Sequence, residues 1–148
     1  MNIKEAKQLA NNLMNNHKLN DWTFVFDSAV RRFGCCFYKV KKISLSRKLV
    51  ELNSVEQVKD VILHEIAHAL APSDAGHGLI WKKLATSVGA KCERTYDDKV
   101  ITSPKKYKAV CSNGHIVFRH RMKRISCRNC SSIFDEKYLF KYELNKTN

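Results

Sequence analysis

Two histidines and a glutamate in this sequence have the order and spacing of a metal site: His64, Glu65 and His68 form the pattern HExxH. On a helix, residues four positions apart lie on the same face, so both imidazole rings can bind one Zn²⁺ ion. Glu65 then lies beside the metal, where its carboxylate can take a proton from a water molecule that the metal polarises. The pattern therefore predicts a hydrolytic zinc site with Glu65 as the general base.

A catalytic zinc ion usually has three protein ligands and leaves its fourth position to water. The third ligand can come from His77, Asp74 or Glu93. His77 follows a turn that contains proline and glycine, which can bring its ring back over the metal. Asp74 has the spacing of the third ligand in metzincin-type proteases, but Ala71 stands where those proteases have a tight-turn glycine. Gly89 is expected to end the helix before Glu93. We therefore expect His77 to be the third ligand, with Arg94 and Tyr96 as candidates to stabilise the oxyanion.

A second group of metal-binding residues lies near the C-terminus of the sequence. It pairs a C-x3-H knuckle with a CxxC knuckle, eleven residues apart, and its members are Cys111, His115, Cys127 and Cys130. His120 is a rival for the fourth ligand, but it falls in a segment expected to be a strand. Four protein ligands close the coordination sphere, so this site is expected to be structural, in a zinc ribbon with each knuckle at a hairpin turn.

Basic residues gather between and within these knuckles. The chain carries 27 Lys and Arg against 14 Asp and Glu, a net charge of +13, and residues 101–148 hold 11 basic and 3 acidic residues, a net charge of +8. An excess of this kind is typical of a segment that binds a polyanion, and equally of a solvated basic face that aids solubility. For the first interpretation, Phe118 and Tyr107 could stack on unpaired bases. The expected DNA contacts are Arg119, Arg121, Lys123, Arg124 and Arg128.

Hydrophobic periodicity indicates the elements that position these residues. Apolar residues at helical spacing predict three helices, and Ser54 with Gln57 marks the start of the one that carries the HExxH motif. Alternating apolar and polar residues predict three short strands, expected to be antiparallel. The helices expected are 3–16, 55–70 and 78–88. The strands expected are 22–27, 36–40 and 43–46, followed near the C-terminus by 107–111, 116–118 and 133–134.

The chain is long enough for one compact domain with a small appendage. We expect a first domain over 1–96, a polar connector over 97–106 and a zinc ribbon over 107–148, in which a metal replaces an ordinary core. The sequence has no apolar run long enough to span a membrane and no secretory signal at its start. The expected location is therefore the cytoplasm, where the protein could associate with the nucleoid. The chain is separately expected to be a monomer.

The segment from Trp22 to Lys91 resembles the SprT-like metallopeptidase domain, which also occurs in the eukaryotic DNA–protein crosslink protease Spartan. The resemblance is carried by His64-Glu65-Ile66-Ala67-His68-Ala69-Leu70 and by Gly76-His77-Gly78-Leu79-Ile80-Trp81-Lys82. It implies a zincin-like fold with His64, His68 and His77 as zinc ligands and Glu65 as the base, and it implies that a C-terminal ribbon is common. The substrate implied is protein on or near DNA.

These observations together predict an α+β fold, with helices packed on a three-stranded antiparallel sheet and a β zinc ribbon after it. The expected function is zinc-dependent hydrolysis of peptide bonds, with two zinc ions per chain, one catalytic and one structural. Single-stranded or partly unpaired DNA is the expected nucleic-acid partner. The alternatives are a zinc-containing nucleic-acid-binding module without catalysis, and a hydrolase of another bond; Glu65 favours an enzyme, because structural zinc does not need it.

Overall fold

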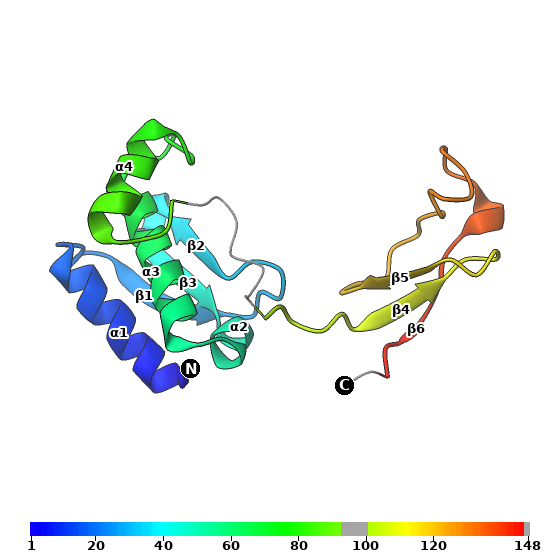
Figure 1. The fold of residues 1–148 in the computed structure, drawn as a ribbon, viewed down its shortest axis with the longest axis horizontal. Coiled ribbons are helices and arrows are strands. Elements are labelled where there is room, and N and C mark those ends of the chain that lie inside the picture. The colour runs from blue at the N-terminus through cyan, green and yellow to red at the C-terminus, as the bar shows by residue number, and fades with distance from the viewer. Residues whose placement is uncertain (93–100, 147–148) are drawn as a thin grey trace. The chain divides into compact units, whose positions relative to one another are not determined.

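The computed structural model describes residues 1–92 and 101–146 and divides the chain into two compact units, Met1–Ser103 and Pro104–Asn148. The boundary lies inside the expected connector, of which residues 97–100 fall outside the described residues. Each unit has its own three-stranded sheet (Figure 1). In the described part of the chain, no helix is both long and apolar enough to cross a membrane.

The first unit is an α+β fold, as predicted. Its helices are α1 (Ile3–Asn16), α2 (Arg47–Leu52), α3 (Val55–Leu70) and α4 (Leu79–Val88), and its strands are β1 (Thr23–Asp27), β2 (Gly34–Phe37) and β3 (Lys42–Ser46). Helix α3 begins with the predicted capping box, in which Ser54 and Gln57 each bind the other's backbone amide. The left-handed Gly89 ends α4, also as predicted (φ 82°).

The prediction of an antiparallel sheet is wrong for one of its two strand pairs. The strand order is β1-β3-β2, and β2 runs antiparallel to β3, whereas β1 runs parallel to β3. The second strand also lies earlier than 36–40, since residues Tyr38–Val40 form a 3-10 helix, η1, that turns the chain into β3. Alternation of apolar and polar residues indicates a half-buried strand but not its direction, so the parallel pairing of β1 with β3 could not be predicted from it.

The core of the first unit lies between the sheet and the helices α1 and α3, which pack against its strands (Figure 1). The α3 residues Val58, Ile62 and Ile66 are fully buried, as are Ile43 and Leu45 of β3. Helix α4 packs on α3 and contributes Trp81, which is also fully buried. The helix with the HExxH motif is therefore held from several sides.

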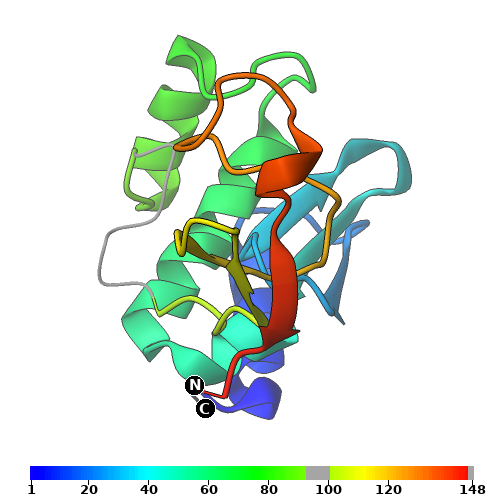
Figure 2. The same cartoon turned by 90° about the vertical axis from the view of Figure 1, so that its right-hand side faces the viewer.

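The second unit is a small antiparallel sheet in the order β5-β4-β6. Its strands are β4 (Tyr107–Val110), β5 (Ile116–Arg119) and β6 (Lys141–Leu144), and a 3-10 helix, η2, covers Glu136–Tyr138. Figure 2 shows the chain passing through η2 and returning as β6, coloured orange to red. The strand expected at 133–134 is wrong, since Ile133 and Phe134 are exposed and outside any strand. β6 takes the third place in the sheet instead.

Candidate active site

Helix α3 places the two motif histidines one above the other on the face that turns toward α4. The α3 residues on both sides are packed in the core, which fixes the helix and therefore the starting point of each side chain. His64 and Glu65 are buried, with 8% and 4% of their surface exposed, and His68 is half-buried. The motif is thus part of the core, and its polar atoms need partners there.

His77 returns to the motif through the turn between α3 and α4. The amide of Ala75 donates to the carbonyl of Pro72, and the amide of Gly78 donates to the carbonyl of Ala75, which tightens the loop. Gly76 adopts a positive φ of 52° just before the histidine, a conformation that side chains disfavour. This backbone brings His77 Nε2 to 3.1 Å from His64 Nε2 and to 3.0 Å from His68 Nε2.

The three histidine nitrogens fit a zinc ion. Zinc–nitrogen bonds of ~2.0–2.1 Å in tetrahedral geometry separate neighbouring ligand nitrogens by roughly 3.4 Å, near the distances seen here. His64, His68 and His77 form one of the two groups of possible metal ligands in the described ranges, 1–92 and 101–146. Asp74 is exposed and belongs to neither group. Glu93, Arg94 and Tyr96 lie outside the described residues.

The protonation of two of these rings also suits a metal. Burial, with a further contribution from the neighbouring histidines, lowers the pKa of His64 to about 4. Burial and the nearby His77 lower the pKa of His68 to about 4 as well. Both imidazoles are therefore neutral at pH 7, which is the form that binds a metal ion.

Trp81 forms a wall beside all three histidines. The centroid of its ring system lies 4.7 Å from that of His64, 5.2 Å from that of His68 and 4.6 Å from that of His77. Trp81 is completely buried and is therefore part of the core. Its position shows more, because the same side chain also fixes the rings of the metal site.

Glu65 points to the sheet and lies against the first residue of β2. A Cβ atom built on Gly34 would lie 2.5 Å from Glu65 Oε1 and 2.9 Å from Glu65 Cδ, and both distances are too short for a non-bonded contact. The carboxylate thus needs a glycine at this position of the strand. Burial raises the pKa of Glu65 to about 8, and the charge of Arg32 acts in the opposite direction. The charge of a zinc ion at the neighbouring histidines would lower this pKa further, toward the ionised carboxylate that a general base requires. Glu65 was predicted from the motif, whereas Gly34 was not singled out, because it lies before the strand expected at 36–40 and the contact with Glu65 is set by the tertiary structure.

Tyr38 is a second residue of the site that the sequence analysis missed. It lies in η1, directly after β2, and its hydroxyl oxygen is 3.5 Å from His68 Nδ1. The edge of Trp22 contacts its ring, with the centroids 6.5 Å apart. It was missed because its position in the alternating pattern indicated an ordinary strand residue.

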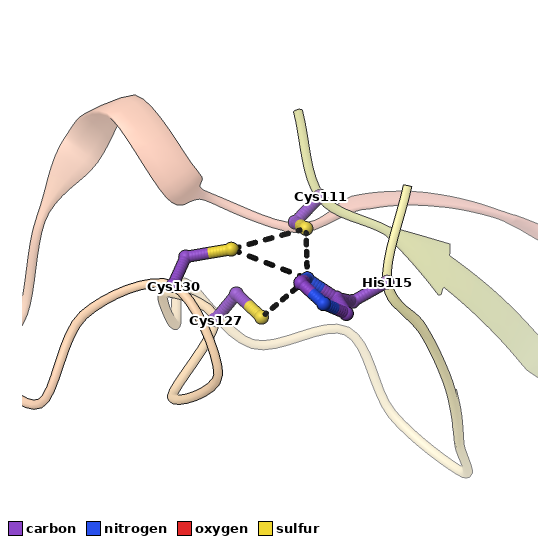
Figure 3. A group of neighbouring side chains, drawn as sticks. All are labelled: Cys111, His115, Cys127 and Cys130. Carbon is purple, nitrogen blue, oxygen red and sulfur yellow. Dashed lines mark hydrogen bonds between the residues drawn. The ribbon is translucent and has the colours of Figure 1, made fainter. Parts of the chain in front are cut away.

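The second group of metal ligands closes on itself in the second unit. Figure 3 shows the side chains of Cys111, His115, Cys127 and Cys130 pointing toward one another from the two knuckles. The sulfurs of Cys111 and Cys130 are 3.8 Å apart, and His115 Nδ1 lies 3.2 Å from Cys130 Sγ and 3.7 Å from Cys127 Sγ. A tetrahedral zinc ion with bonds of ~2.3 Å to sulfur and ~2.0 Å to nitrogen requires separations of roughly 3.5–3.8 Å.

Tight turns shape both knuckles of this second group. Gly114, at a φ of 79°, lets its amide donate to the carbonyl of Cys111, and the amide of Cys130 donates to the carbonyl of Cys127. The side-chain amide of Asn113 also donates to Cys130 Sγ over 3.5 Å. The rival ligand His120 follows β5 and is not part of the group, and it is not in the strand where it was expected.

The five basic residues expected to bind DNA are all exposed in the second unit. Arg124 forms an ion pair with Glu136 and lies over the ring of Phe134, and Arg128 donates to the carbonyl of Ser132 over 3.4 Å. Phe118 is exposed, whereas Tyr107 packs edge-on against Tyr142. A shallow groove of about 340 Å³ adjoins the basic segment, and its lining residues are Met122, Lys123, Arg124, Leu139, Phe140 and Tyr142.

Comparison with known proteins places the first unit in a family. The model of the SprT-like family matches residues 3–103, about two thirds of the chain. No curated protein matches the chain significantly. A crystal structure of the metallopeptidase zymogen jannalysin from Methanocaldococcus jannaschii is similar over 58% of this chain and 83% of its own, with 19% sequence identity and a TM-score of 0.47. By the family match, which includes the HExxH helix and the Gly-His-Gly turn, this chain belongs to the SprT-like family.

Proposed function

We propose that this protein is a zinc-dependent metallopeptidase with His64, His68 and His77 as its metal ligands and Glu65 as its general base. The observation that carries the proposal is the meeting of three imidazole nitrogens within about 3 Å of their neighbours, beside a buried glutamate. Membership of the SprT-like family supports it. A purely structural zinc site would need a fourth ligand and would have no use for a buried carboxylate.

Each residue has a distinct task in this mechanism. Zinc, when bound, supplies a Lewis acid that polarises a water molecule and the carbonyl of the peptide bond. The three imidazoles would hold it, which leaves the fourth coordination position to water. Glu65 accepts a proton from the attacking water at a carboxylate oxygen and then gives it to the nitrogen of the departing amine. The new oxygen–carbon bond forms first, and the nitrogen–carbon bond breaks once the departing nitrogen has taken the proton, so a carboxylic acid and an amine result.

Strand β2 offers a way to hold the substrate. It lies at the edge of its sheet, paired with β3, and Gly34 at its start touches Glu65. An extended peptide that adds to this edge by backbone hydrogen bonds would pass directly beside the carboxylate. This arrangement favours an unfolded or extended segment of protein as the substrate.

We further propose that the second unit brings the peptidase to proteins on or near DNA. Its net charge of +8 and the exposed Arg119, Arg121 and Lys123 support binding to phosphates. Exposed Phe118 is available to stack on an unpaired base. The closed cysteine and histidine group would hold this unit in shape as a zinc ribbon.

The test of the peptidase is Glu65→Gln, which keeps the size of the side chain but cannot accept a proton at neutral pH. We expect cleavage of an unfolded protein to fall by roughly 10²-fold or more, while the zinc content stays the same. Glu51→Gln, the same change on an exposed residue of α2, is the matched control and should leave cleavage unchanged. A wild-type protein that holds zinc but cleaves no protein, with or without DNA, would instead favour a DNA-binding module.

A further inference from the structure

The contact behind His68 assigns a task to a residue that does not touch the metal position. We propose that Tyr38 is a positioning residue, which fixes the ring of His68 so that Nε2 faces the metal. This inference rests on the proposed function, because it takes the three histidines as metal ligands. It adds a residue from η1 to a site that otherwise comes from α3 and the turn after it.

The two nitrogens of His68 face different neighbours. Nε2 lies 3.0 Å from Nε2 of His77, in the group of possible ligands, whereas Nδ1 lies 3.5 Å from the hydroxyl oxygen of Tyr38. The two nitrogens flank Cε1, and their bonding directions diverge widely, so the hydroxyl lies on the side of the ring that faces away from the metal position. Tyr38 therefore acts on the metal through His68 and is not placed to touch the reacting atoms.

The hydrogen-bond chemistry of a neutral imidazole explains what this contact does. A ring that gives the lone pair of Nε2 to a metal carries its proton on Nδ1, and the Nδ1–H group then donates to the oxygen of Tyr38. The bond selects the tautomer that binds metal and limits rotation of the ring. Partners of this kind commonly change metal affinity by about 10–100-fold when they are removed.

Tyr38 is itself held in place. The ring of Trp22 contacts the ring of Tyr38 edge-on, with an angle of 79° between the ring planes. The backbone carbonyl of Tyr38 accepts a hydrogen bond from the amide of Lys41, which closes the turn of η1. Lys41 has a left-handed backbone (φ 44°) that leads the chain into β3. The ring system of Trp81 also lies 5.2 Å from the ring of His68. His68 is thus in contact with a fixed tyrosine and a buried tryptophan.

Two variants of Tyr38 separate the hydroxyl from the ring. Tyr38→Phe removes only the oxygen, and Tyr38→Leu also removes the aromatic ring that Trp22 contacts. Zinc affinity can be measured for each site by chelator competition, and cobalt substitution distinguishes the sites by their spectra, because only one of them contains thiolates. Tyr142→Phe is the matched control, since the hydroxyl of Tyr142 is buried with no hydrogen-bond partner in the described part of the chain.

We expect Tyr38→Phe to weaken zinc binding at the three-histidine site by about 10–100-fold and to leave the cysteine site and the unfolding temperature unchanged. Excess zinc should then restore cleavage, which would not happen if the hydroxyl took part in the reaction. Unchanged affinity in Tyr38→Phe together with a loss in Tyr38→Leu would overturn the proposal, because the ring alone would then matter. A wild-type protein that binds no metal at the three histidines would refute the proposed function itself, a result distinct from either of these.

Discussion

The two groups of metal ligands sit in opposite surroundings. Two members of the histidine group lie on α3, a helix whose residues next to them are buried in the core, and Trp81 packs against all three rings. The cysteine group joins two turns in a unit whose buried apolar residues, within 104–146, are Ala109, Cys111 and Cys127. In the first unit a core of ordinary size can order the histidines without a metal. In the second unit few residues are buried, so on the proposed function all four side chains would be needed to bind a metal that stabilises the unit.

The neighbours of the two groups differ in the same sense. Around the histidines, Glu65, Gly34 and Tyr38 come from different elements of the fold. The proposed base, Glu65, and the proposed positioning residue, Tyr38, therefore lie near the same three rings. Around the cysteines, a polar contact comes from Asn113 of the knuckle itself, whose amide donates to a sulfur. This difference supports chemistry at the first group and stability at the second.

The largest effect should follow from breaking the cysteine group. Cys127→Ser should unfold the second unit, because zinc in small domains of this type supplies on the order of 10 kcal/mol of folding free energy. The first unit should stay folded, since its core does not depend on this metal. Amide NMR spectra would show the signals of residues 104–146 collapse while those of 1–92 persist. Persistence of both sets would mean that the second unit folds without metal.

Gly34→Ala tests whether the histidine site depends on the present position of Glu65. The added Cβ would collide with the carboxylate of Glu65, and a displacement of about 1 Å at a reacting group can lower the rate by roughly 10²-fold. Peptide cleavage per zinc-loaded molecule is the measurement. Gly89→Ala is the control, because nothing lies within 4 Å of a Cβ there and its positive φ costs stability alone, about 1 kcal/mol. Full activity of Gly34→Ala would show that Glu65 does not need its present position.

A smaller effect is expected from the basic segment of the second unit. Replacing Arg121 and Lys123 with alanine should flatten the dependence of single-stranded DNA binding on salt by about 1.5 units of the log–log slope, if both contact phosphate. Arg124→Ala should change it less, because this side chain already pairs with Glu136. Replacing the exposed Lys4 and Lys7 of α1 is the control for charge. An equal change in that control would mean that DNA binding is not confined to the second unit.

Local patterns predicted much of this structure. The spacing of apolar residues and the Ser54 cap gave α3 its observed bounds, because a helix is defined by contacts within one turn. The ligand spacings also indicated which histidines and cysteines the structure brings together. Both depend on residues that are near in sequence or on chemistry that few residue types can perform.

What the sequence did not reveal depends on contacts between distant segments. The parallel pairing of β1 with β3 and the third strand β6 are set by how separate segments meet. The same holds for Gly34, which meets a residue 31 positions later, and for Tyr38, which meets His68. A glycine at the start of a strand and a tyrosine in the turn after it have many possible roles, and only the tertiary structure selects one.

The most direct test of the account compares two variants that each remove one ligand. His77→Ala and Cys130→Ala should each hold one zinc ion in native mass spectrometry, against two in the wild type. The measurement is the rate at which each cleaves a short free peptide that needs no DNA. We predict that Cys130→Ala cleaves it at close to the wild-type rate and that His77→Ala does not cleave it detectably. Equal rates in the two variants would contradict the assignment of the histidine group as the catalytic centre.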